Sequence, residues 1–156
     1  MAVRPAVAED ALRLAELYQL ATEELAPVRG GRVLLGLGRR PEPVAASFRR
    51  QVDDPGTVLV VGMVGPDVVG YGSGRTFELA GEDAERLAAV EELYVLPGAR
   101  RQGVGRALGR ALVAWSLARG CAGVDASALP GSRAVKSFFE SEGFTARLLV
   151  MHRRLP

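Results

Sequence analysis

The 156-residue sequence has one cysteine, one histidine and one lysine: Cys121, His152 and Lys136. A single cysteine excludes a disulfide within the chain, and Cys121 with His152 cannot supply the four ligands of a structural zinc site. We therefore expect no metal centre. No histidine lies near Cys121 in the sequence, which favours a small buried residue over a nucleophile at this position. The lone histidine is interpreted as a surface residue.

The sequence also lacks long apolar runs. No stretch approaches 18 uninterrupted apolar residues, and the first residues do not resemble a signal peptide, so we expect a cytosolic protein with no membrane partner. The formal net charge is only +2, which gives no overall reason to bind nucleic acid. The length is that of one ordinary domain, which we place at residues 1–156.

Charge is unevenly distributed along the chain. Residues 97–124 contain five arginines and no acid, whereas residues 78–92 contain six acids and one base. A basic segment that follows an acidic one indicates one anionic and one cationic ligand side by side. A nucleic-acid site on the arginines is an alternative, and it would show steeply salt-dependent binding. Aromatic residues are not interleaved with these arginines, which argues against it.

Hydrophobic periodicity and turn residues predict one α/β domain. The expected order is βααβββαβαβ, in which the segment 87–129 is a βαβ unit with two parallel strands, and 57–77 is an antiparallel hairpin. This order predicts a mixed central sheet with helices on both faces. Residues 27–41 are the least predictable. We expect strands at 3–7, 57–64, 68–77, 87–96, 122–129 and 144–155, and helices at 9–25, 43–52, 104–119 and 132–142.

The strongest motif is the loop that follows the strand at 87–96 and opens the next helix. Residues 100–108 read Arg-Arg-Gln-Gly-Val-Gly-Arg-Ala-Leu. Backbone amides at a helix N-terminus are unpaired and attract anions, and Gly103 and Gly105 remove side chains that would keep a phosphate at a distance. The motif therefore predicts a phosphate site, to which charge could be added by Arg100, Arg101 and Arg106.

Two nucleotide-binding motifs fail on this loop. The dinucleotide fingerprint needs a third glycine at position 108, which is Leu108, and a Walker A loop needs lysine after the glycine. The pattern Arg100-x-x-Gly103-x-Gly105, after the strand residues 91–97, instead resembles the pyrophosphate motif of the GNAT family of N-acetyltransferases. The resemblance extends over nearly the whole chain, and only 27–56 fits loosely.

The resemblance implies an α/β sandwich in which two parallel strands splay apart and admit acetyl-coenzyme A as cosubstrate. The amides of residues 101–106 would hold the pyrophosphate, and the backbone of Leu93, Tyr94 and Val95 would pair with the pantetheine arm and polarise the thioester carbonyl. The cofactor-binding residues implied are Leu93, Val95, Arg100, Arg101, Gln102, Gly103, Val104, Gly105, Arg106, Ser132 and Phe138.

The second motif of the family falls at residues 132–144 and departs from the usual pattern twice. Ser132 replaces an asparagine, although its hydroxyl could still cap the helix or bond the cofactor. Phe139 replaces a tyrosine that often protonates the leaving thiolate. The general acid is therefore open among water, Tyr94 and Ser137. A thiol pKa of about 8.5 makes the thiolate a tolerable leaving group.

A base is needed because an amine acceptor arrives protonated. Strand alternation puts Glu92 and Tyr94 on one face of the strand, and Leu93 and Val95 on the face toward the following helix. We expect Glu92 to be the base, directly or through water, with Tyr94 as a further catalytic candidate. The alternatives without a catalytic role are that the carboxylate of Glu92 only attracts cations and that the ring of Tyr94 only packs against its neighbours.

The sequence therefore predicts an N-acetyltransferase that uses acetyl-coenzyme A to acetylate a primary amine of a small molecule or peptide, by direct attack in a ternary complex. The acidic stretch at 78–85 would help to attract a cationic acceptor. The alternative is a non-catalytic acyl-coenzyme A sensor, suggested by Phe139. A homodimer is a further expectation, with 27–41 and the last strand as its candidate contacts.

Overall fold

The structure is a computed structural model that describes residues 1–81 and 84–155. Five strands form one sheet in the order β1-β2-β3-β4-β5. The first four pair antiparallel and β5 runs parallel to β4, which confirms the mixed sheet expected from the sequence. The strands are β1 (Ala2–Pro5), β2 (Thr57–Val64), β3 (Asp67–Glu78), β4 (Arg86–Val95) and β5 (Gly123–Ala126).

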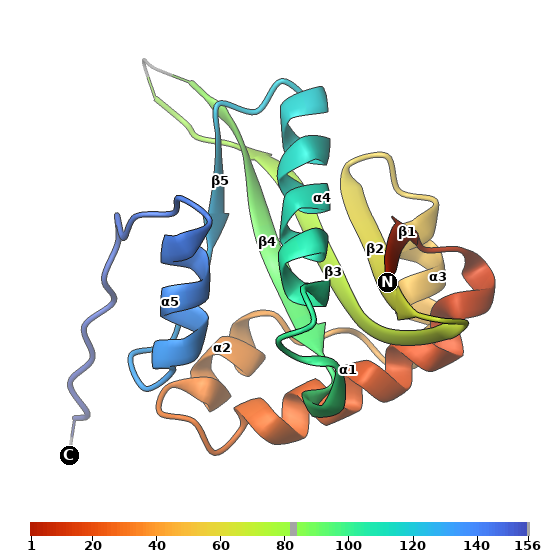
Figure 1. The fold of residues 1–156 in the computed structure, drawn as a ribbon. Coiled ribbons are helices and arrows are strands. Elements are labelled where there is room, and N and C mark those ends of the chain that lie inside the picture. The colour runs from red at the N-terminus through yellow and green to blue at the C-terminus, as the bar shows by residue number, and fades with distance from the viewer. Residues whose placement is uncertain (82–83, 156) are drawn as a thin grey trace.

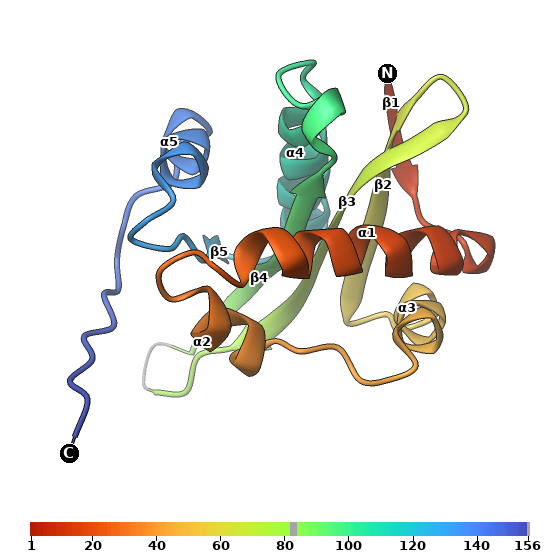
Figure 2. The same ribbon diagram turned by 90° about the horizontal axis from the view of Figure 1, so that it is seen from below.

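Helices cover both faces of this sheet, as predicted (Figures 1 and 2). Helices α1 (Ala11–Leu25) and α3 (Val44–Val52) lie on one face, and α4 (Val104–Ala118) lies on the other. Helix α5 (Arg133–Ser141) stands beyond β5, at the edge of the sheet. None of the described helices is long and apolar enough to cross a membrane.

Two hydrophobic cores follow from these two layers. Helical spacing puts Leu14 and Leu17 of α1 on one stripe, where they pack with Phe48 of α3 against the sheet. On the other face the stripe of α4 packs against β2 and its neighbours through Val104, Leu108 and Leu112. The two cores fix the sheet between α1 and α4, so one face of β4 lies toward α1 and the other lies toward α4.

Helix α4 approaches β2 closely at Gly62. A Cβ atom at this glycine would lie 2.6 Å from Cγ1 of Val104, closer than real Cβ atoms come, and 3.3 Å from Cδ1 of Leu108, which is a tight contact. The glycine therefore allows the first turn of α4 to lie directly on the strand. This contact holds the N-terminus of α4, and with it the loop that begins at Arg100, in a fixed position over the sheet.

Two segments differ from the sequence prediction. The unpredictable stretch contains a short helix, α2 (Gly31–Leu37). The strand expected at 144–155 is wrong, because this segment pairs with no strand of the described chain and runs away from the domain (Figure 1). Its run of apolar residues has strand propensity, but a strand also needs a neighbouring edge to bond to. Strand β5 is also shorter than expected, since it ends at Ala126.

A buried ion pair ties β1 to the start of α1. The guanidinium of Arg4 donates to both carboxylate oxygens of Asp10, at 2.7 and 2.9 Å, and the amide of Val7 donates to the same carboxylate at 2.9 Å. The hydrogen bond from Arg4 is the main cause that lowers the pKa of Asp10 below its ordinary value, and burial acts in the opposite direction. The charged carboxylate is therefore favoured by the folded state.

Asp10→Asn is expected to lower the free energy of unfolding by about 2 kcal/mol near neutral pH, because it removes a charge-assisted pair at a buried site. Since the folded-state pKa of Asp10 is lowered, its contribution is present above the unfolded-state pKa of about 3.9 and is lost as the pH falls through the folded-state value. Urea denaturation of both proteins at a series of pH values measures this. The free energies of unfolding of the two proteins should converge in acid. Asp53→Asn, at the exposed end of α3, should change neither the free energy of unfolding nor its dependence on pH.

Candidate functional site

The loop between β4 and α4 presents a run of free backbone amides. Gly103 has φ +86° at the start of α4, and Arg101 has φ +62°, so both lie in the left-handed region. The amides of residues 101–106 make no hydrogen bond within the described chain, and the first backbone bond of the helix is from Ala107 to the carbonyl of Gly103 at 3.0 Å. Six consecutive donors are therefore free at a helix N-terminus, which is the arrangement that binds an anion.

The side chains of this loop have other contacts. Arg100 donates to the carbonyl of Val95 at 2.8 Å and to the carboxylate of Glu24 at 2.6 Å, which ties the loop to α1. Arg106 donates to Glu142 at the end of α5, at 2.6 Å. The amides, rather than these two guanidinium groups, are therefore the donors presented to an anion.

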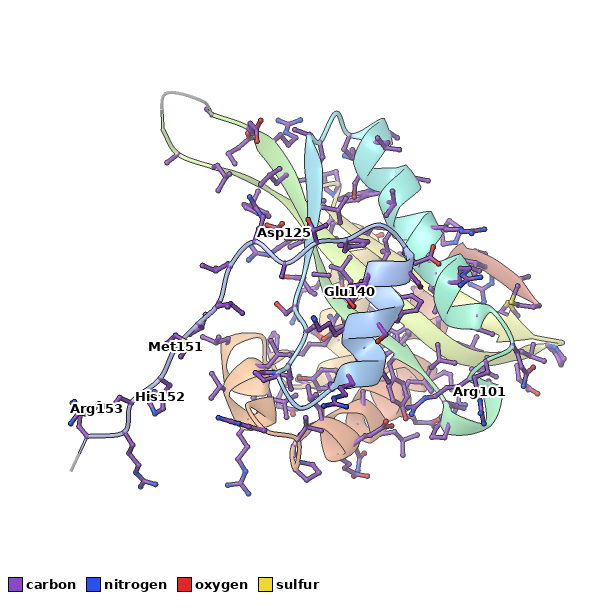
Figure 3. All side chains as sticks on the ribbon, turned by 60° about the vertical axis from the view of Figure 1, so that its left-hand side comes forward. Arg101, Asp125, Glu140, Met151, His152 and Arg153 are labelled. Carbon is purple, nitrogen blue, oxygen red and sulfur yellow. The ribbon has the colours of Figure 1, made fainter. Side chains whose placement is uncertain are left out.

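Three other predicted residues shape the same loop. Gln102 donates its side-chain amide to the carbonyl of Gly98 at 3.0 Å, so its side chain braces the loop. The side chain of Val104 is buried in the core, and only its backbone amide can reach a ligand. Arg101 lies exposed on the loop in front of α4 (Figure 3). It is the arginine of the motif that remains best placed to approach a bound phosphate.

Next to this loop, β4 has an open edge. Strand β5 pairs with β4 only from Leu87 to Val90, whereas β4 continues to Val95. Within the described chain, residues 91–95 therefore have no strand on their β5 side. Leu93 and Val95 pack toward α4, as predicted. An extended ligand could bond to this edge as an added strand and meet the free amides at its end.

A hollow of about 300 Å³ lies between α4, α5 and β4. Phe138 approaches α4 at two glycines, because a Cβ atom would lie 3.9 Å from its ring at Gly105 and 3.6 Å from it at Gly109. Phe139 packs at 5.3 Å from Phe138, between ring centroids, and therefore has an aromatic packing role here. The apolar side chains around the hollow include Val90, Leu93, Leu112, Phe138, Phe139 and Phe144.

Ser132 stands at the N-cap position of α5, but its side chain makes no capping hydrogen bond. The expectation that its hydroxyl caps the helix is therefore wrong. The backbone there departs from the extended conformation typical of a capping residue, with φ −106° and ψ 72°. Binding of a cofactor by this hydroxyl stays a prediction.

On the opposite face of β4, Glu92 is held in a polar cluster. It lies opposite Ser73 of β3, whose hydroxyl donates to Oε2 at 3.2 Å. The guanidinium of Arg40 donates to Oε1 at 2.9 Å and to Oε2 at 2.7 Å. The side chain of Glu92 is 16% exposed, so this carboxylate is largely enclosed yet reaches solvent. The predicted base is therefore paired with a cation.

Sequence reasoning missed Arg40, which comes from the segment between α2 and α3. Its guanidinium also donates to Oε1 of Gln51 at 2.7 Å and stacks 3.8 Å above the ring of Phe48, while its backbone amide donates to the hydroxyl of Tyr18 at 3.1 Å. This segment, residues 38–43, is irregular and contains two prolines, so no periodicity indicated where Arg40 would point. The partnership with Ser73 could have been found by pairing β3 with β4, because both side chains share a face.

Tyr94 shares the face of Glu92, as predicted, and packs against the core under α1. Burial is the main cause that raises the pKa of its hydroxyl, and the neighbouring charge of Glu24 raises it further. Tyr71, opposite Tyr94 on β3, is almost fully buried, and burial raises its pKa well above the ordinary value. Both phenols therefore remain protonated at neutral pH.

The described part of the acidic stretch at 78–85 does not lie beside the loop between β4 and α4. Glu78 and Arg86 form an ion pair at 2.7 Å across the β3–β4 hairpin, at the opposite end of β4 from the loop (Figure 1). Ten residues of strand separate the two ends by about 30 Å. Glu78 therefore lies away from the loop, whereas Glu91 and Glu92 of the same acidic segment lie toward the end of β4 that leads into it. Glu82 and Asp83 lie outside the described residues.

The fold, the loop and the open edge agree with one family of enzymes. The sequence profile of the acetyltransferase (GNAT) family matches residues 14–144, a span that contains the sheet from β2 onward, the loop, α4 and α5. The chain belongs to the GNAT acetyltransferase family. GNAT acetyltransferases use acetyl-coenzyme A, and the free amides at 101–106 are groups that suit its pyrophosphate.

Solved structures show that the GNAT fold extends over the whole chain. A mutant of the BH1408 protein from Bacillus halodurans superposes with a TM-score of 0.83 at 17% identity, and covers 100% of each chain. A putative acetyltransferase from Agrobacterium tumefaciens gives 0.76 at 21% identity over 99% of this chain and 100% of its own. The aminoglycoside N-acetyltransferase AAC(6')-Iy, in complex with coenzyme A, gives 0.76 at 17% identity over 99% and 93%. No curated protein matches the sequence.

Proposed function

We propose that this GNAT protein transfers an acetyl group from acetyl-coenzyme A to a primary amine of a small molecule or peptide, by direct attack in a ternary complex. The observation that carries the proposal is the meeting of two features on one strand. The open edge of β4 at 91–95 leads into the free amides at 101–106, and Glu92 projects from the same stretch of strand toward α1 and α3.

The residues present fit the coenzyme. The amides at 101–106 would hold the pyrophosphate, and the backbone of Leu93, Tyr94 and Val95 would bond to the pantetheine arm along the open edge. The bound thioester supplies an acetyl group activated for attack. A backbone amide of this edge is placed to donate to the thioester oxygen as negative charge develops on it.

Glu92 would take the proton that the amine must lose. Its Oε1 atom accepts one hydrogen bond, from Arg40, and a carboxylate oxygen can accept two. A water bound at the remaining lone pair would therefore relay the proton from the acceptor ammonium to the carboxylate. The fork of Arg40 and the hydroxyl of Ser73 hold this carboxylate in one orientation, which makes Arg40 a positioning residue.

The neutral amine would then attack the thioester carbon, and the bond from that carbon to sulfur would break. The electron pair leaves with the sulfur, which takes a proton, while the nitrogen releases its second proton to solvent water as the amide forms, and the donor to sulfur is reprotonated from solvent. We assign this proton to the hydroxyl of Tyr94, because this residue belongs to the open stretch of β4 at 91–95 and its phenol carries a proton at neutral pH. Phe139 has no proton to give and packs among the aromatic rings of α5.

The acceptor would approach from the side of α1 and α3. The AAC(6')-Iy structure includes a complex with a bisubstrate analogue of coenzyme A and acetylneamine, and its fold resembles this one with a TM-score of 0.74. A polyamine acceptor is therefore the first class to test for this chain. An acceptor that carries several ammonium groups would also suit the anion at Glu92.

The expected result is that the protein releases free thiol from acetyl-coenzyme A in the presence of at least one amine of a panel of aminoglycosides, polyamines and peptide N-termini. Thiol release follows from acetyl transfer and is measured with a colorimetric thiol reagent, and mass spectrometry of the amine should show one added acetyl group. Binding of acetyl-coenzyme A without thiol release from any amine would contradict the proposal and favour an acyl-coenzyme A sensor.

A further inference from the structure

A second carboxylate lies on the acceptor face of the sheet, one strand away from β4. Asp125 is in β5, and its partner in the parallel pairing with β4 is Ala89, which is itself paired with Arg75 of β3. Paired residues of neighbouring strands point to the same face of a sheet. Arg75 lies two residues after Ser73, which is opposite Glu92, and residues two apart in a strand also share a face. The side chains of Asp125 and Glu92 therefore project from the same face.

The pairing also determines how far apart these two carboxylates lie. Along β3, the positions of Ser73 and Arg75 are separated by about 6.8 Å, and one strand spacing of about 4.8 Å separates β4 from β5. These displacements are perpendicular, so the backbone positions of Glu92 and Asp125 are about 8 Å apart. Because both side chains leave the same face, two cations held by these carboxylates would be separated by a similar distance.

Asp125 already holds a cation, which comes from the segment after α5 (Figure 3). Nε of Arg147 donates to Oδ1 at 2.8 Å, and Nη2 donates to Oδ2 at 2.5 Å. The side chains of Arg147 and Asp125 are 56% and 39% exposed, whereas those of Arg40 and Glu92 are 11% and 16% exposed. An exposed ion pair adds little stability, because water competes for both charges. The guanidinium on Asp125 can therefore be exchanged for another cation, while Arg40 stays on Glu92.

We propose that Asp125 binds a second ammonium group of the acceptor, so that the preferred substrate is a diamine or polyamine with two nitrogens about 8 Å apart. This inference rests on the proposed function and narrows its acceptor class. One amine of the substrate reaches Glu92 and is acetylated, while the other displaces Arg147. The N–H donors of an ammonium group then replace those of the guanidinium on the same two oxygens. Arg147 is thus a competitor of the substrate within the chain.

The spacing predicts which diamine fits. An extended chain advances about 1.2 Å per bond, so the seven bonds between the nitrogens of 1,6-diaminohexane span about 8 Å. The four bonds of 1,3-diaminopropane span only about 5 Å, which is too short to reach both carboxylates. Hexylamine has the same carbon chain as 1,6-diaminohexane but a single nitrogen. It is therefore the matched ligand that isolates the contribution of the second ammonium group.

Calorimetric titration of the protein saturated with coenzyme A tests the site without requiring turnover. The natural protein is expected to bind 1,6-diaminohexane about 10-fold more tightly than hexylamine, because a charge-assisted hydrogen bond contributes about this much. Asp125→Asn should remove the difference, whereas Asp67→Asn, the same change at the exposed start of β3, should keep it. Arg147→Gln removes the competing cation and should tighten binding of the diamine by a factor of about three, with hexylamine unchanged.

The opposite signs expected for Asp125→Asn and Arg147→Gln separate an ammonium site from a structural ion pair. Equal binding of the two ligands by the natural protein, or weaker binding of the diamine by Arg147→Gln, would overturn the inference. Thiol release with the same two amines separates it from the proposed function. If binding of the diamine depends on Asp125 but neither amine releases thiol, acetyl transfer to these amines is rejected and the ammonium site stands. If both amines release thiol with equal KM, the acetyltransferase stands and the site is rejected.

Discussion

Gly105→Glu is expected to weaken binding of coenzyme A at least 100-fold while the protein remains folded. Gly105 lies in the first turn of α4, among the free amides at 101–106. A Cβ atom there would lie 3.7 Å from Val95 and 3.9 Å from Phe138, which is ordinary contact. The new carboxylate would share the site of the pyrophosphate, and opposition of like charges at close range costs several kcal/mol, which corresponds to about 100-fold or more.

The position separates binding from stability. A glutamate in the first turn of a helix interacts favourably with the helix dipole, so the Tm of Gly105→Glu should not fall below that of the natural protein. Gly103 would be a poorer choice, because its φ of +86° makes any side chain strained. Isothermal titration calorimetry with coenzyme A measures the effect. Gly98→Glu is the matched control, since it adds the same charge in open space outside the amide run. If both variants bind like the natural protein, the pyrophosphate lies elsewhere.

Glu92→Gln is expected to lower kcat at neutral pH by about 100-fold, with a smaller change in KM for the amine, because a general base contributes roughly this much to the rate. The amide can still accept from Arg40 and Ser73, so the cluster around it stays bonded. Steady-state rates of thiol release against amine concentration measure both constants. A rise in KM with kcat unchanged would instead mean that Glu92 only attracts the cation.

The neighbouring residue supplies the control for this prediction. Glu91 is the extra residue at the irregularity in the pairing of β3 with β4, and it forms an ion pair with Arg75 at 2.6 Å on the surface. Glu91→Gln therefore makes the same chemical change one residue away and should leave kcat within a factor of about two. Arg40→Gln should give an intermediate loss in kcat, because the carboxylate remains but loses the fork that orients it.

Most of the fold, and the loop with free amides before α4, could be predicted from the sequence, because both depend on local patterns. Helix α4 has a stripe at 104, 108 and 112, and the loop before it has glycines at 103 and 105. Alternation along β4 was enough to place Leu93 and Val95 toward α4 and Glu92 toward α1. In each case the signal lies within one element and its immediate neighbours.

The acceptor side could not be predicted, because it depends on contacts between segments far apart in the sequence. Arg40 reaches Glu92 across 52 residues, and Arg100 reaches Glu24 across 76. The neighbours of Arg40 do not distinguish it from other arginines, and the motif that singles out Arg100 does not indicate Glu24 as its partner. The strand expected at 144–155 failed for a related reason, since its apolar pattern indicates strand propensity but not whether a neighbouring strand edge lies beside it.

The division of β4 between two faces has a consequence for how this enzyme could change its substrate over evolution. Apart from Ser73, the side chain that bonds to Glu92 is that of Arg40, and Arg40 is itself held by Tyr18 and Gln51, so this cluster comes largely from the first third of the chain. The groups that we propose to bind the coenzyme come after residue 91. Mutations that alter the choice of amine can therefore accumulate before β2 while the acetyl-donor machinery stays intact. Grafting residues 1–56 from a relative with another acceptor would be a direct way to exchange specificity within one catalytic frame.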